Sequence, residues 1–153
     1  PADLEWLMPT FWVGFGVAMM PGSALCNRYG TLQVMCMSAV LGAISAAAAA
    51  HAGSLELLVA AQLVSGGAWG SMLMCGFTAA VAAGRTGREG LALGLLFAVL
   101  AAATLSRIGA VAAGLPKQAE WAMWFSYAPI ALWVAGALIV GSLAVRQSRS
   151  AGV

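Results

Sequence analysis

The stretch SALCNRYGT, residues 23 to 31, separates two long apolar runs and decides how the chain is organised. It places an asparagine, an arginine and a glycine together in a chain of which only 8% is charged. Glycine lets the backbone reverse tightly, and asparagine tolerates turns and can cap helix ends. We therefore expect a tight polar turn here, joining two antiparallel helices.

The composition indicates that lipid surrounds these helices. Hydrophobic residues make up 62% of the chain, against seven basic and five acidic side chains. A soluble domain of this size needs a more highly charged surface. We therefore predict an integral membrane protein with the lipid bilayer as its first partner. The net charge of +2 is too small to suggest a nucleic-acid partner.

Five apolar segments are long enough to cross the hydrocarbon core as helices, which takes about 20 residues each. The links between them are short, so consecutive helices should be antiparallel neighbours. The third segment is longer than one straight crossing and should tilt or protrude. We predict an all-α bundle that forms a single transmembrane domain over residues 1–153, with spans at about 5–25, 31–50, 55–83, 91–114 and 122–145.

The basic residues predict the orientation, because cytoplasmic loops carry an excess of Lys and Arg. Lys117 is the one basic residue on the side of the amino terminus. The opposite side carries Arg28, Arg85, Arg88, Arg146 and Arg149. We therefore expect the amino terminus outside and the carboxyl terminus in the cytoplasm, in a bacterial inner membrane.

The spacing of the first turn resembles the loop signature of the major facilitator superfamily, Gly-x-Leu-x-Asp-Arg-x-Gly-Arg. Leu25, Arg28 and Gly30 match this signature. Ser23 takes the place of its first glycine and Asn27 the place of its aspartate, while a threonine replaces the final basic residue. In that family the signature lies between the second and third helices of each six-helix half.

A second stretch is similar to the same family at the corresponding place. Arg88, Ala92 and Gly94 open the fourth span and look like the family's start to the fifth helix of a half. The resemblance implies that the five spans correspond to helices eight to twelve of a twelve-helix transporter. The first helix of this half and the whole other half would then lie outside these residues.

Small residues recur at intervals that favour close helix packing. Gly14, Ala18 and Gly22 are four apart in the first span, and Gly66 and Gly70 form a GxxxG pair in the third. In lipid the hydrophobic effect does not drive helices together, so van der Waals contact between closely approaching backbones must stabilise their association. These residues therefore serve helix packing, or form surfaces that slide as a transporter changes conformation.

Arg107 is the one charge deep within a span. It lies seven residues before Gly114, at a depth of roughly 10 Å. Gln62 reaches a similar depth in the third span, and Glu56 lies nearer the same surface. Arg107 either extends to the outer interface or, with Gln62 and Glu56, forms a substrate-binding or gating site.

Eight methionines and three cysteines raise the question of copper, because soft sulfur ligands select Cu(I). Neighbouring residues on a helix point in different directions, and methionine is a common packing residue. We therefore predict no metal and no cofactor. The odd number of cysteines argues against a disulfide scaffold. The spans also lack paired carboxylates and multiple histidines, so we do not expect an enzyme.

The resemblance implies a secondary active transporter of a small solute that works by alternating access, of which this chain is the carboxyl-terminal part. Its partners would be the missing amino-terminal half and an unidentified small-molecule substrate. The alternative is a structural or accessory subunit of a larger membrane complex, such as a transporter remnant. Its partners would be the other membrane subunits.

Overall fold

The computed structural model describes residues 7–84 and 87–151, and within these ranges the chain is all-α. The five predicted helices are present, and the second and third have the predicted bounds. A short 3-10 helix, η2, precedes the last one. The elements are α1 (Leu7–Tyr29), α2 (Thr31–Ala50), α3 (Leu55–Ala83), α4 (Glu89–Ala112), η2 (Leu115–Lys117) and α5 (Ala119–Ala151).

Four helices among the described residues are long and apolar enough to cross a membrane: α2, α3, α4 and residues 120–149 of α5. This supports the prediction of a membrane protein. The first predicted span, whose first two residues lie outside the described ranges, forms α1 but is not among the four. Pro9, Pro21, Asn27 and Arg28 lower its apolar character. A membrane crossing by α1 therefore stays a prediction.

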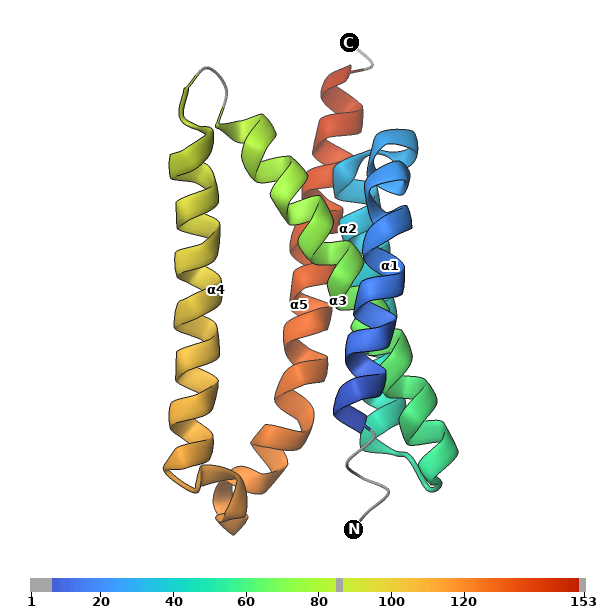
Figure 1. The fold of residues 1–153 in the computed structure, drawn as a ribbon, viewed down its shortest axis with the longest axis vertical. Coiled ribbons are helices and arrows are strands. Elements are labelled where there is room, and N and C mark those ends of the chain that lie inside the picture. Colours follow the sequence, from blue (N-terminus) through green and yellow to red (C-terminus); the bar gives the residue numbers. More distant parts are fainter. Residues whose placement is uncertain (1–6, 85–86, 152–153) are drawn as a thin grey trace.

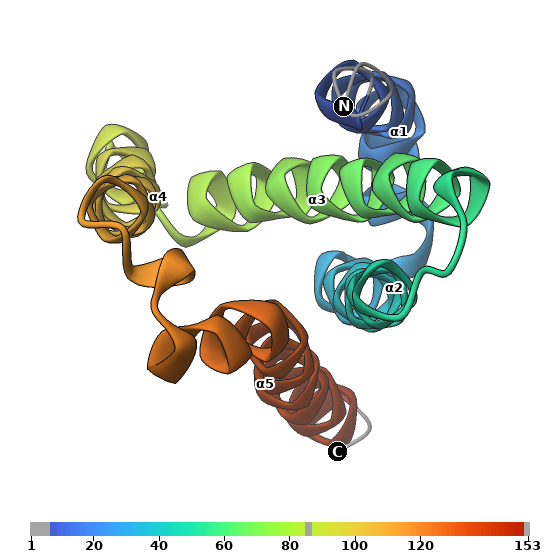
Figure 2. The same cartoon turned by 90° about the horizontal axis from the view of Figure 1, so that it is seen from below.

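Helix α3 forms the centre of the arrangement. It contacts α1, α2 and α4, and Figure 2 shows it running obliquely between α1 and α2. Helix α5 packs along α2. Helix α4 stands apart in Figure 1, and among the described elements it contacts only α3 and η2. The buried residues therefore lie where α1 and α2 pack against α3 and where α5 packs along α2.

Glycines set the close crossing of α1 and α3. A Cβ atom at Gly14 would overlap the Leu63 carbonyl group, and one at Gly66 would overlap the Phe11 carbonyl group. A Cβ at Gly70 would lie 2.6 Å from the Phe15 carbonyl oxygen. The two backbones can approach this closely only because these positions carry no side chain.

Gly22 and Ala18 continue the same contact toward the other end of α1. A Cβ at Gly22 would lie 3.5 Å from the Met74 Cβ, which is an ordinary packing distance. The Ala18 Cβ would lie 3.5 Å from a Cβ at Gly67. The five small residues named from the sequence therefore all lie at the α1–α3 crossing.

A disulfide joins Cys26 of α1 to Cys75 of α3, a pairing that was not predicted from the sequence, where the odd number of cysteines argued against a disulfide scaffold. Both residues are buried in a small cluster with Val34, against which Met35 packs. The two cysteines are 49 residues apart in the sequence, and the crossing of two helices brings them together. Framework spacing in the sequence cannot reveal such a pair. Cys36 remains a free thiol.

Candidate functional site

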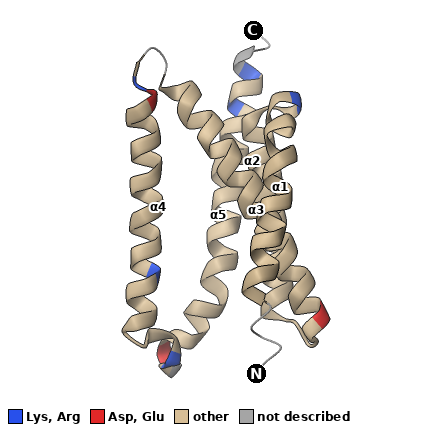
Figure 3. Cartoon of the chain, viewed as in Figure 1, with Lys and Arg blue, Asp and Glu red and all other residues tan. Residues whose placement is uncertain are grey.

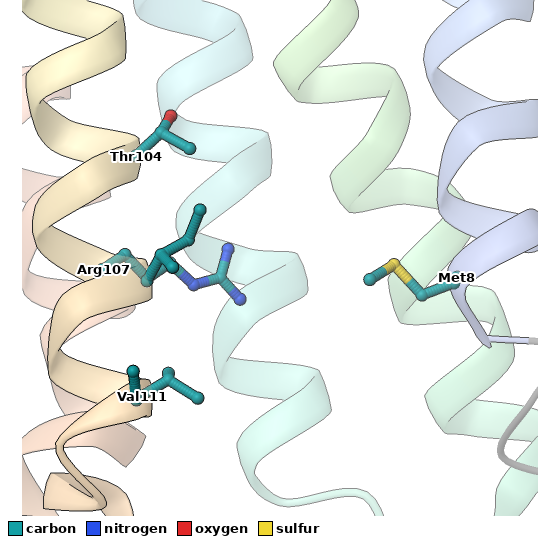
Figure 4. A pocket seen from close by; sticks show the side chains of 6 residues that line it. Met8, Thr104, Arg107 and Val111 are labelled. Carbon is teal, nitrogen blue, oxygen red and sulfur yellow. The ribbon is translucent and has the colours of Figure 1, made fainter.

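Arg107 lies on α4 and faces the space between α4 and α1. Figure 4 shows its guanidinium group extending from α4 toward Met8, which extends from α1. A cavity of about 470 Å³ lies between them. Its lining residues are Met8, Thr104, Arg107, Ile108, Val111 and Ala112. The Arg107 side chain therefore faces the space between α4 and α1.

Among the described residues, Arg107 is the only charged side chain that lines this cavity. The Thr104 hydroxyl lies one turn earlier and donates to the Leu100 carbonyl at 2.8 Å, so its proton is already used. Within the part of the chain that the structure describes, Arg107 has no hydrogen-bond or ion-pair partner. Because a guanidinium group cannot lose its proton in a protein, this charge needs acceptors from elsewhere.

The two predicted companions of Arg107 do not join it at the cavity. Glu56 lies exposed in the first turn of α3, which the Ser54 hydroxyl caps by accepting a hydrogen bond from the Leu57 N–H. Gln62 is half-buried further along α3. Neither residue lines the cavity, so the cluster of Arg107, Gln62 and Glu56 is not assembled in this structure.

The turn motif occupies the junction of α1 and α2. Gly30 is the single residue between the two helices, and its φ of 89° lies in the left-handed region that favours glycine. Its N–H donates to the Cys26 carbonyl at 3.0 Å, and its own carbonyl accepts from the Val34 N–H at 3.2 Å. The backbone therefore reverses here with both helix ends hydrogen-bonded.

The side chains of this turn are largely open to their surroundings. Leu25, Asn27 and Arg28 are exposed, and Ser23 is half-buried. The Arg28 guanidinium lies 5.4 Å from the centre of the neighbouring Tyr29 ring, a cation–π distance. Arg28 is thus held beside its own helix end, where it remains accessible to a partner.

The second motif lies at the same end of the molecule. Arg88 is the residue that precedes α4, and its side chain is exposed. Gly94 lies exposed in α4, with no atom within 4 Å of the position of a Cβ. Figure 3 shows basic residues gathered at the end where α1 ends, α4 begins and α5 ends. The two motifs thus share the basic end.

Two features of the site were missed by sequence reasoning. Met8 faces Arg107 from another helix, and nothing in the sequence indicates that pairing. Thr104 lies three residues before Arg107, so helical spacing could have placed both on one face. Among the described residues, no group of three or more His, Cys, Asp or Glu side chains is placed to hold a metal ion.

Comparison with protein-family models, with curated proteins and with solved structures finds no match to this chain.

Proposed function

We propose that this chain is the carboxyl-terminal part of a secondary active transporter that moves a small solute by alternating access. The observation that carries the proposal is the single-residue turn at Gly30, which presents Arg28 at the end of the molecule that also carries Arg88. In the major facilitator superfamily, the motifs that these residues resemble occupy the cytoplasmic loops.

In this proposal, the loop around Arg28 stabilises the state that is closed toward the cytoplasm. Asn27 stands where the family has an aspartate, and an amide cannot form the ion pair that a carboxylate would. This stabilisation should therefore be weaker than in the family. Arg107 would bind the substrate or gate the outer half of the cavity, because its charge faces inward and none of the described residues pairs with it.

The alternative, an accessory subunit of a larger membrane complex, is favoured by α4. This helix has no buried residue and contacts only α3 and η2 among the described elements, so much of its surface is available to another protein. The free surface fits a docking role as well as it fits a transporter half.

Transport can be tested with the full gene product reconstituted in proteoliposomes and presented with a panel of small solutes under an ion gradient. We expect one solute class to accumulate. Arg107→Leu should abolish accumulation while the protein still inserts, and Arg107→Lys should restore only part of it, because the planar guanidinium group is lost.

An Arg107→Leu protein with full activity would overturn the proposed binding or gating role of Arg107. The side chain would then only extend to the membrane interface. If no solute in the panel moves, and the chain purifies in fixed proportion with other membrane proteins, the accessory function replaces transport. Thr104→Ala is the control, because it lines the same cavity and changes no charge.

A further inference from the structure

The face of α4 that is directed toward α1 is not covered by another described helix, and it carries one charge, that of Arg107. None of the 24 residues of α4 is buried, and α4 makes no contact with α1 or α5 among the described residues. Ile108 and Val111, which line the cavity with Arg107, are 58% and 55% exposed. Lipid could cover such apolar side chains. What else could lie against this face must therefore be judged from its one charged residue, Arg107.

Lipid alone is a poor neighbour for Arg107. Acyl chains offer no hydrogen-bond acceptor, and an unpaired arginine in a membrane helix costs up to about 2.5 to 3.5 kcal/mol, the value at the helix centre. The side chain would then turn toward the nearest interface. In this structure it extends across the cavity toward Met8 instead (Figure 4).

A hydrated cavity or a polar solute also fits the walls poorly. Met8, Ile108, Val111 and Ala112 offer apolar atoms, and the Thr104 hydroxyl already donates to its own helix. A water molecule in a buried site needs two to four polar partners. Here the described lining residues provide one cation and one hydroxyl within an otherwise apolar wall.

A helix matches both the walls and the charge. A membrane helix satisfies its own backbone hydrogen bonds and presents apolar side chains, and one carboxylate on it would neutralise Arg107. We propose that a further transmembrane helix, apolar except for one aspartate or glutamate, lies between α4 and α1 and pairs that carboxylate with Arg107. The inference does not depend on transport, since a transporter and an accessory subunit could both contain such a helix.

A second copy of this chain does not provide the carboxylate at the right depth. Glu56, Glu89 and Glu120 lie in the first turns of α3, α4 and α5. Asp3 and Glu5 precede α1 in the sequence. Arg107 lies more than one turn before the end of α4 at residue 112, so the pairing helix must carry its acidic residue within its apolar span and not in a terminal turn.

The test uses the full chain in phosphatidylcholine vesicles with a synthetic leucine–alanine peptide of about 24 residues, long enough to span the bilayer. One peptide carries glutamate at the depth of Arg107, and the matched peptide carries glutamine there. Energy transfer between fluorophores on the chain and the peptide measures association at alkaline pH, where the glutamate is ionised.

The glutamate peptide should bind about tenfold more tightly than the glutamine peptide, the range expected of a close charge pair. Arg107→Gln should remove this preference. Arg107→Glu should transfer it to a peptide that carries arginine at the same place. Because Arg107 has no partner within residues 7–84 and 87–151, these variants should insert and fold like the parent chain.

Crosslinking locates the peptide on α4. Val111→Cys lies on the cavity, whereas Leu105→Cys lies about 160° away from Arg107 around the helix, at 100° per residue. With Cys36 replaced by alanine, a cysteine-bearing glutamate peptide should crosslink to Val111→Cys several times faster than to Leu105→Cys.

Three results would overturn the proposal. Equal binding of the glutamate and glutamine peptides would leave lipid as the cover of this face. Faster crosslinking at Leu105→Cys would place the peptide on the opposite side of α4. If acetate abolishes the glutamate preference and the peptide no longer crosslinks at Val111→Cys, the cavity binds a small anion instead of a helix.

Discussion

At the α1–α3 crossing, the absence of a Cβ atom at single glycines allows the two helices to pack closely. Gly66 is buried against the backbone of Phe11, and a Cβ there would also lie 3.0 Å from the Phe15 nitrogen. The neighbouring backbone cannot move away as a flexible side chain could. Gly16 lies on the same helix as Phe11 and Phe15, but no atom lies within 4 Å of its Cβ position. The same substitution should therefore have opposite effects at the two glycines.

Gly66→Ala should destabilise the folded chain by about 1 to 3 kcal/mol, the range for forcing extra volume into a packed contact. Gly16→Ala is the matched control and should be neutral or slightly stabilising, because alanine favours helix more than glycine does. Thermal unfolding in detergent micelles measures both variants. Equal stability of the two would show that α1 and α3 are not packed as described.

At the scale of the elements, α1 and α3 are held together in two independent ways. Close glycine packing acts along the crossing, and the Cys26–Cys75 disulfide joins the helices toward the end that carries Arg28. The two sulfur atoms are buried among apolar side chains, which keeps soluble reductants away. Helix α4 has neither device and depends on a small contact with α3, including the Phe77–Phe97 ring pair at 5.5 Å.

The disulfide predicts how many thiols can be labelled. Protein isolated in native membranes and unfolded in detergent without a reductant should accept one maleimide-polymer group, at Cys36. After reduction it should accept three, which a gel resolves as separate bands. Cys75→Ala should give two without reduction, because Cys26 is then free. Three additions to the unreduced parent chain would contradict the disulfide.

For the whole molecule, the positions of the helices along the chain could be predicted from the sequence better than the contacts between the helices. The bounds of α2 and α3 followed from apolar length and from the links at Gly30 and at residues 51–54. The Cys26–Cys75 pair and the position of Met8 opposite Arg107 did not. Both depend on which faces of distant helices meet, and lipid-exposed helices are apolar on every side. Their hydrophobic pattern therefore contains little information about the packing face.

The distribution of arginines predicts the orientation of the chain in the membrane, and exposed residues at the two ends of the helix bundle can test it. Gln118 follows η2, and Ser148 lies near the end of α5 at the basic end of the molecule; both are exposed. Single cysteines at these two positions, in a Cys36→Ala chain, report the two sides of the membrane. A membrane-impermeant maleimide should label Gln118→Cys in intact cells and Ser148→Cys only after the cells are opened. Labelling in the reverse order would place the amino terminus inside. It would also remove Arg28 and Arg88 from the cytoplasmic surface, where the proposed transport cycle needs them.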